Sequence, residues 1–436
     1  MERDLTFENS SPGRNQTIYK QMNDIKRAIE QDEKISKMKK RRNSILTFFV
    51  LLIGIGLINF YSSILRFDNI TIHSKLIKHG VTLILSFCAF IATCKFDYRK
   101  YSSSFARALF AVVGGLIFLI VAIGPSTYFP TINGGKGWIR FAGIGFQVTE
   151  IFKIFFIMII ASILARGKDG GEKIPYYKNF ISVLFYVAVF FLLLGFPLKD
   201  LGTGIHYVMI TAFLIFMSDI PNKLLTWISG GTIAGILISL VSAYNFPAIY
   251  SFLDGYKQHR VKIYLDGIFK NTYDRMDAFQ IYQSLVAFGT GGLLGKGYGN
   301  GVQKYNYIPE VETDFAIATF AEEMGFIGMF LVLASFFILF VLIMNVAETS
   351  KDYFAKYLIA GIAGYFITQV IINIGVAIGL IPVFGIPLPF ISSGGSSLLT
   401  LSIAMGIVLN VNKANIKEAR KIKRWDYGNE RYNRKS

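Results

Sequence analysis

Residues 44–65 read SILTFFVLLIGIGLINFYSSIL and contain no charged side chain. An apolar run of about 20 residues is long enough to cross a bilayer as a helix. The basic tract KMKKRR at residues 37–42 lies directly before this run, and positive residues of this kind hold their side of a span in the cytoplasm. Because residues 1–43 are polar and charged and lack the apolar segment of a signal peptide, we expect the first span to be an uncleaved anchor.

The composition extends this interpretation to the whole chain. Of the 436 residues, 53% are hydrophobic and only 17% are charged, whereas about 25% are charged in a typical soluble domain. We therefore predict an all-α polytopic membrane protein with ten transmembrane helices, and we exclude a soluble enzyme and a disordered protein. The predicted spans are residues 44–65, 76–94, 105–124, 148–165, 179–196, 203–217, 224–244, 315–346, 357–380 and 390–409. The eighth is overlong, so we expect it to begin above the membrane or to tilt.

The net charge of +17 is concentrated at the two ends of the chain and in the loops after the second, fourth and eighth spans. In a soluble protein this charge would suggest nucleic acid, but here it indicates topology and contact with anionic membrane lipid. An even number of spans puts both termini on one side, which the basic loops assign to the cytoplasm. We expect a basic tail at 1–43, a membrane domain at 44–412, a second basic tail at 413–436 and no nucleic-acid partner.

Three segments outside the spans are informative. Residues 17–38 carry apolar residues at helical spacing, which suits either an interfacial amphipathic helix or a solvated extension. The outer loop at 125–147 is Gly-rich and holds Trp138. The outer loop at 245–314 is much longer than the roughly 15 residues beyond which a loop is usually functional or disordered. Its aromatic, Gly and charged residues favour an ordered, functional loop.

Ionisable residues at membrane depth cost about 2.5–3.5 kcal/mol each on insertion scales, so they mark candidate functional sites. Glu150 and Lys153 are three residues apart on one helical face, and they suit either an ion pair that locks two helices or contact with substrate. Asp200 begins the sequence DLGTG at an outer boundary, where it is either the N-cap of the sixth span or a site residue. The four histidines form no zinc motif.

Asp314 lies where the long outer loop re-enters the membrane. A carboxylate there is partly desolvated and close to extracytoplasmic substrate, which suits a general base, although capping of the next helix explains its position equally well. Glu322 lies eight residues further on, about 80° around a continuous helix, and we expect it to face the same cavity. Basic residues of the outer segments would suit a pyrophosphate group: Lys136, Arg140, Arg260, Lys262, Lys296 and Lys304.

Short motifs follow one another along the chain. They are GWIR (137–140) with FQVTE (146–150) and Lys153, DLGT (200–203), YKQHRV (256–261), QIYQS (280–284) with GGLLGKG (291–297), TDF (313–315) with EEMG (322–325), NIG (373–375), Pro382, and GIPLPFIS (385–392) with GGSS (394–397). In this order they resemble the SEDS family (shape, elongation, division and sporulation), the RodA and FtsW type of bacterial cell-wall polymerase. The resemblance runs from residue 44 to residue 412, and GNGVQK at 299–304 is closer to the division-type FtsW branch.

This resemblance implies a glycosyltransferase that polymerises lipid II, the undecaprenyl-pyrophosphate-linked disaccharide pentapeptide, for cell division or cell shape. It would act at the outer face of the bacterial cytoplasmic membrane, with inversion at the donor's anomeric carbon. Asp314, in the TDF motif, would be the general base for the acceptor's 4-hydroxyl, a step typically worth about 10²–10⁴-fold. The candidate substrate-binding residues are Trp138, Arg140, Glu150, Lys153, Asp200, Arg260, Gln283, Lys296, Glu323 and Ser396.

The resemblance also bears on cofactors and partners. A divalent cation (Mg²⁺ or Mn²⁺) is a candidate, and no organic cofactor is expected. The chain has no transpeptidase-like Ser-x-x-Lys domain, so cross-linking would need a class B penicillin-binding protein as partner, beside other proteins of the division or elongation machinery.

Several positions depart from the family's pattern. Glu312 replaces the usual His before TDF, Lys199 replaces the Pro before DLGT, Val148 and Thr149 replace Pro-Ser, Gly137 replaces a basic residue, and Ser393 replaces Tyr. The first change puts a second carboxylate beside Asp314, where it either repels that charge or helps to bind a divalent cation.

Two other classes of function compete with the enzyme. A lipid II flippase or another polytopic transporter would use the intramembrane charges Glu150, Lys153 and Glu323. However, carriers concentrate polar motifs near the bilayer midplane, whereas here the densest motifs lie in an outer loop and at Asp314. A non-enzymatic scaffold would not need Asp314 at all.

Overall fold

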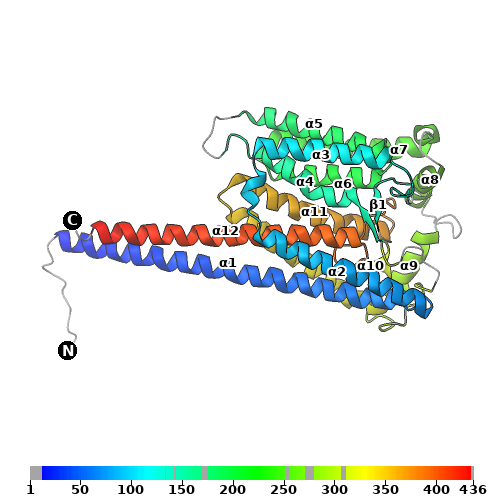
Figure 1. Cartoon of the computed structure of the whole chain (residues 1–436), viewed down its shortest axis with the longest axis horizontal. Helices are drawn as coiled ribbons and strands as arrows, with labels where there is room; N and C mark the ends of the chain where they lie inside the picture. Colours follow the sequence, from blue (N-terminus) through cyan, green and yellow to red (C-terminus); the bar gives the residue numbers. More distant parts are fainter. Residues whose placement is uncertain are drawn as a thin grey trace.

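The computed structural model describes residues 12–132, 134–141, 144–168, 174–251, 255–270, 279–305 and 311–433. Within these ranges the fold is helical apart from one β-hairpin, which confirms the predicted all-α polytopic class (Figure 1). The elements are α1 (Pro12–Ile64), α2 (Asn69–Lys95), η1 (Tyr98–Tyr101), α3 (Ser104–Ile123), β1 (Trp138–Phe141), β2 (Ile144–Gln147), α4 (Val148–Leu164), α5 (Tyr176–Gly195), α6 (Leu201–Phe216), α7 (Asn222–Asn245), η2 (Pro247–Tyr250), α8 (Gly255–Lys270), α9 (Phe279–Gly291), α10 (Ala316–Thr349), α11 (Tyr353–Ala377) and α12 (Gly395–Asn433).

Each of the ten predicted spans forms a helix, namely α1 to α7 and α10 to α12. In the described part of the chain, 8 helices are long and apolar enough to cross a membrane by themselves. The other two, α4 and α6, have 17 and 16 residues. Most residues of α4 are buried. In the most apolar stretch of α11, 83% of the residues are buried, whereas in that of α7 no residue is buried. The short helices therefore lie inside the bundle, and α7 presents its apolar surface outward, where lipid tails solvate it.

The tenth span begins at Gly395, so the prediction of residue 390 was wrong. Pro387 and Pro389 lack the N–H that a helix requires, and Phe390 has a φ of 63°, which is not helical. Residues 382–394 instead form an irregular segment whose Ile386 and Leu388 side chains are buried. This segment forms part of the cavity wall described below.

The overlong eighth span is α10, and it is broken at Gly325, where φ is 63° and ψ is −167°. Glycine adopts this conformation readily because it has no Cβ; a Cβ here would lie 2.2 Å from the amide nitrogen of Gly295. Four main-chain hydrogen bonds of 2.9–3.1 Å join residues 292–297 to residues 322–327 around the break. They satisfy polar groups that hydrocarbon would otherwise leave without partners. The extra length is therefore accommodated by a break in the helix.

Helices α1 and α12 extend well beyond the bundle, with 53 and 39 residues (Figure 1). Their extensions lie side by side, and both chain ends are at the same end of the molecule. Ile35 and Met38 of α1 pack against Ile416 and Ala419 of α12. Residues 17–38 are thus part of the continuous helix α1, and two of the last of them, Ile35 and Met38, are packed against α12. The expected boundaries at residues 43 and 412 fall inside continuous helices.

The outer loops cover the opposite end of the bundle (Figure 1). The loop at 125–147 contains the β1–β2 hairpin, in which Trp138 pairs with Gln147. The loop at 245–314 contains η2, α8 and α9. The Tyr264 hydroxyl of α8 donates to the Leu380 carbonyl (3.0 Å), and the Ser284 hydroxyl of α9 donates to the Ala377 carbonyl (2.7 Å). The described part of the long loop is therefore ordered, as expected, and docked on the bundle beside α11.

Candidate active site

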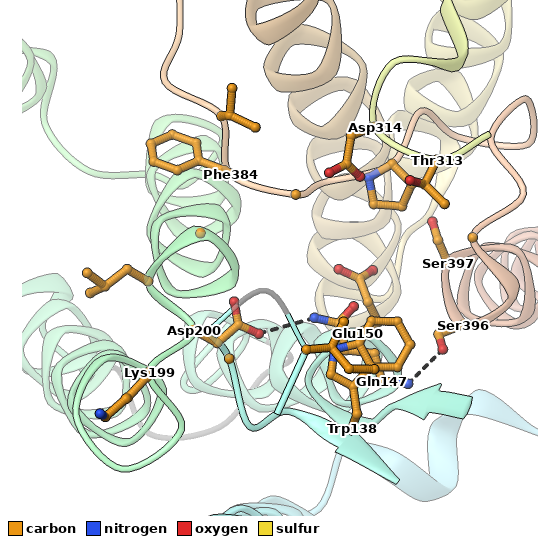
Figure 2. Close-up of a pocket in the computed structure, with 18 of the residues that line it drawn as sticks. Trp138, Gln147, Glu150, Lys199, Asp200, Thr313, Asp314, Phe384, Ser396 and Ser397 are labelled. Carbon is orange, nitrogen blue, oxygen red and sulfur yellow. Dashed lines mark hydrogen bonds between the residues drawn. The ribbon is translucent and has the colours of Figure 1, made fainter. Parts of the chain in front are cut away.

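A cavity of about 280 Å³ lies at the end of the bundle that carries the outer loops. Its wall combines the β-hairpin, the N-terminal ends of α4, α6 and α12, one turn of α8, the segment before α10 and the irregular segment 382–394 (Figure 2). The predicted site residues that line it are Trp138, Glu150, Asp200, Arg260, Asp314 and Ser396. Segments far apart in the sequence thus bring three carboxylates and one guanidinium to a single cavity.

Asp314 enters the cavity from the segment that precedes α10 (Figure 2). It is 9% exposed. Its main chain is held in place, because the Asn373 amide of α11 donates to the Asp314 carbonyl (2.8 Å) and also to the Ile386 carbonyl (2.9 Å). Helix α10 begins at Ala316 and shows no side-chain N-cap hydrogen bond. The capping alternative for Asp314 is therefore wrong, and its carboxylate borders the cavity.

Glu150 lines the cavity from the first turn of α4, and Lys153 lies directly beneath it. The two side chains form an ion pair, with exposures of 2% and 0%. Lys153 also contacts Nδ1 of His206 at 2.9 Å, and Nε2 of His206 contacts the Thr368 hydroxyl at 3.0 Å. The ion-pair alternative is correct for Lys153, which links α4 to α6 and α11. Glu150 is both a member of this pair and part of the cavity wall.

Asp200 is both an N-cap and a cavity residue. One carboxylate oxygen accepts a hydrogen bond from the Thr203 N–H (3.1 Å), which caps α6. The other accepts from the Gln147 side-chain amide (3.2 Å) and the Thr149 hydroxyl (3.1 Å), as part of Figure 2 shows. A single carboxylate therefore ties the start of α6 to the junction of β2 and α4. The N-cap alternative is therefore confirmed, and Asp200 also lines the cavity, where its role as a site residue stays a prediction.

We expect Asp200→Ala to lower the free energy of unfolding by about 1–2 kcal/mol, the usual loss for a removed N-cap, because three donors lose their acceptor. Asp200→Asn keeps a side-chain oxygen for the cap and should lose less. Thermal unfolding of the purified protein in detergent measures both changes. Equal melting temperatures for the parent and Asp200→Ala would contradict this role.

The remaining predicted cavity residues are fixed by main-chain contacts. Arg260 donates from Nη1 to the Val383 carbonyl (3.0 Å), so α8 is joined to the irregular segment. The Ser396 hydroxyl accepts from the Gln147 main-chain N–H (2.7 Å), which joins the first turn of α12 to β2 (Figure 2). The cavity wall is therefore cross-linked by hydrogen bonds between elements.

A second polar cluster surrounds the break in α10 and lies outside the cavity lining. Glu323 is 2% exposed and accepts from Lys304 Nζ (2.7 Å) and from the Ser62 hydroxyl of α1 (2.7 and 2.8 Å). Glu322 is fully buried and accepts from Lys296 Nζ (2.6 Å). Burial raises the pKa of the nearby Tyr298 hydroxyl, and the negative charge of Glu323 adds to the rise. These charges pair with one another and fix the loop 292–305 to α1 and α10.

Several predicted residues therefore do not meet at the cavity. Glu322 was expected to face the Asp314 cavity; it does not line it and pairs with Lys296 instead. Glu323 and Lys296, predicted substrate contacts, belong to the same second cluster. Arg140 has an exposed side chain on β1, and Gln283 lies on α9; neither lines the cavity. Lys153 lies behind Glu150 and also does not line it.

Some residues that line the cavity were not predicted from the sequence as site residues. Gln147, Thr313, Pro387 and Ser397 belong to the quoted motifs, and that membership was the available signal. Phe384 carried no signal. A Cβ on Gly202 would lie 2.4 Å from the Phe384 carbonyl oxygen, so a glycine at the start of α6 allows this chain segment to approach. His206 was one of four unassigned histidines, and only the fold places it against Lys153.

Comparisons with known proteins agree with the geometry. The family model FTSW_RODA_SPOVE, described as a cell cycle protein, matches residues 42–417. The "Probable peptidoglycan glycosyltransferase FtsW" of Coxiella burnetii is 36% identical over 319 residues, covering 72% of this chain and 79% of that protein. The protein with the same name from Trichlorobacter lovleyi is 32% identical over 376 residues, covering 84% and 92%.

Two solved structures share the fold. A chain of a peptidoglycan synthase complex aligns with a TM-score of 0.67 at 22% identity, covering 85% of this chain and 97% of that one. The rod shape determining protein RodA of Thermus thermophilus aligns with a TM-score of 0.57 at 20% identity, covering 85% and 95%. At these identities the likeness concerns the fold alone.

Proposed function

The chain belongs to the FtsW, RodA and SpoVE family of cell cycle proteins, and on this premise we propose that it is a peptidoglycan glycosyltransferase that polymerises lipid II. The family assignment confirms the resemblance found in the sequence, and the relatives' names agree with the FtsW branch. One observation carries the mechanism: the Asp314 carboxylate borders a cavity that is also lined by a guanidinium and a helix N-terminus.

In the proposed reaction, Asp314 removes the proton from the acceptor's 4-hydroxyl. The resulting oxygen nucleophile attacks the donor's anomeric carbon, a new glycosidic bond forms with inversion, and the bond to polyprenyl pyrophosphate breaks. A general base typically contributes about 10²–10⁴-fold to such a step. The fixed main chain of Asp314 supports this role, because a held carboxylate does not have to be ordered during the reaction.

The leaving pyrophosphate carries negative charge that the site must stabilise. Arg260 lines the cavity and is the basic residue best placed for this among the predicted ones. Gly395, Ser396 and Ser397 line the cavity at the start of α12, and the N–H groups of a helix N-terminus bind phosphate well. We therefore assign the donor's pyrophosphate to the Arg260 and α12 side of the cavity and the acceptor hydroxyl to Asp314.

The divalent cation suggested by the sequence stays a prediction. Among the residues that the structure describes, no three His, Cys, Asp or Glu side chains come together as a metal site. Of the cavity carboxylates, Glu150 is paired with Lys153, and Asp200 caps α6. The described side chains therefore do not fit a metal centre of their own, and no step above passes through a metal.

Orientation and partners are part of the same proposal. The basic extensions of α1 and α12 would lie in the cytoplasm, which would put the cavity at the outer face of the membrane. We propose a class B penicillin-binding protein as the cross-linking partner, beside other proteins of the division or elongation machinery. The likeness to a chain from a peptidoglycan synthase complex supports an assembly of this kind.

The test is direct. The purified full chain, together with its partner, receives lipid II and Mg²⁺ or Mn²⁺, and the glycan strands are separated on a gel. Polymer that depends on the chain supports the proposal. Movement of lipid II across vesicles without polymer would favour the flippase instead, and neither activity would favour a scaffold.

A further inference from the structure

The segment Glu312–Asp314 is held by three successive main-chain carbonyls. The Glu312 carbonyl accepts from the main-chain N–H and the hydroxyl of Ser393, both at 2.8 Å. The Thr313 carbonyl accepts from the Ser392 hydroxyl, and the Asp314 carbonyl accepts from Asn373. All three donors come from α11 and the irregular segment. They fix one side of this stretch of chain.

The other side of the segment is held by charge. The Glu312 carboxylate accepts from Lys75 Nζ (2.7 and 2.9 Å) and from Arg66 Nη2 (3.3 Å). Glu312 and Arg66 have side-chain exposures of only 11% and 12%, and Lys75 of 31%. The sequence predicts that the Glu312 carboxylate either repels the charge of Asp314 or helps to bind a divalent cation; in the structure it pairs with two basic side chains. The Glu312 carboxylate forms ion pairs with Arg66 and Lys75.

Those two cations come from opposite sides of one tight turn. Arg66 follows the end of α1, and Lys75 lies in the first turns of α2. Both lie over the ring of Phe67, at 4.5 and 4.4 Å from its centroid. The Asp68 side chain caps α2 by accepting from the Thr71 N–H (3.2 Å), so the turn is itself ordered. The α1–α2 turn thus presents a preformed pair of donors to Glu312.

We propose that Glu312, Arg66 and Lys75 form a clamp by which the α1–α2 turn positions Asp314. Glu312 is then a positioning residue that acts through the chain two residues before the carboxylate. A displacement of about 1 Å in a catalytic group can lower the rate about 100-fold. We therefore expect the ion pairs of Glu312, two residues before Asp314, to affect the rate of catalysis. This inference rests on the proposed function, in which Asp314 is the base.

The experiment compares Lys75→Met with Lys78→Met. Lys78 is an exposed lysine one turn further along α2 and serves as the matched control. Initial rates of polymerisation are measured over a range of lipid II concentrations. We expect kcat to fall about 10- to 100-fold in Lys75→Met with KM within twofold of the parent, and Lys75→Arg to recover most of the loss. Glu312→Gln should behave like Lys75→Met, and the double variant should lose little more than either alone.

Each alternative outcome overturns the clamp. Polymerisation rates equal to the parent's in both Lys75→Met and Glu312→Gln would contradict the clamp. A raised KM at unchanged kcat would show instead that these residues contact the substrate. Melting temperatures are measured alongside; if Glu312→Gln fails to fold, the comparison of Lys75→Met with Lys75→Arg decides. Asp314→Asn is assayed in parallel. If it polymerises normally, Asp314 is not the base and the premise of the clamp fails; if it alone is inactive, only the clamp fails.

Discussion

Asp314→Asn is expected to reduce polymerisation of lipid II by at least about 100-fold, the lower end of what a general base supplies. Asn has nearly the same shape as Asp but cannot take up a proton from the acceptor hydroxyl. The contact with Asn373 goes to the main chain of residue 314, so it survives the substitution. We therefore expect the melting temperature to stay near that of the parent while kcat falls.

Asp266→Asn is the matched control. Asp266 is a carboxylate of the same outer loop, on α8, where it pairs with Lys270 away from the cavity lining. It should polymerise at the parent rate in the same gel assay. Polymer from Asp314→Asn equal to that from Asp266→Asn would show that the cavity carboxylate is not the base.

The second large effect is expected on stability. Lys304→Met should lower the free energy of unfolding by about 3–5 kcal/mol, the usual cost of removing one partner of a buried ion pair. Lys304 is fully buried and Glu323 is 2% exposed, so the remaining carboxylate cannot turn to water. Its contacts with Ser62 and with the N–H groups of Gly299 and Gly301 compensate only in part. Equilibrium unfolding in mixed detergent and lipid measures the loss.

The double variant Lys304→Met with Glu323→Gln separates charge from packing. Without the negative charge, part of the lost stability should return, so the two changes should not be additive. Lys262→Met, at an exposed position on α8, should leave the unfolding free energy unchanged. If Lys304→Met unfolds like Lys262→Met, the cluster at the α10 break contributes nothing to stability.

The membrane helices could be predicted because their signal is local. An apolar run reports burial in lipid whatever it packs against, and all ten predicted runs are helical. The ends were less predictable. The extensions of α1 and α12 are polar helices that pack against each other through residues such as Ile35 and Ile416. A hydropathy pattern does not report such pairing.

In the candidate site, too, the positions of some residues could be predicted from the sequence and those of others could not. Glu150 and Asp200 lie at the starts of spans at the same end of the bundle, so topology alone brings them near Asp314. Glu322 was assigned to that cavity by an angle around a continuous helix, which assumed that the helix starts at Asp314. It starts at Ala316, so Asp314 lies outside the helix that carries Glu322. Glu322 instead pairs with Lys296 of the loop packed against α10, and a single sequence does not reveal that contact.

Helix α12 runs without interruption from the cavity wall, where Ser396 and Ser397 lie, to Asn433 near the chain end. At about 1.5 Å per residue such a rod is far longer than a bilayer core. The structure shows no break in the helix between these two points. A protein that binds the protruding end of α12 and moves it would therefore move one wall of the cavity. The packing of α1 against α12 would resist that motion.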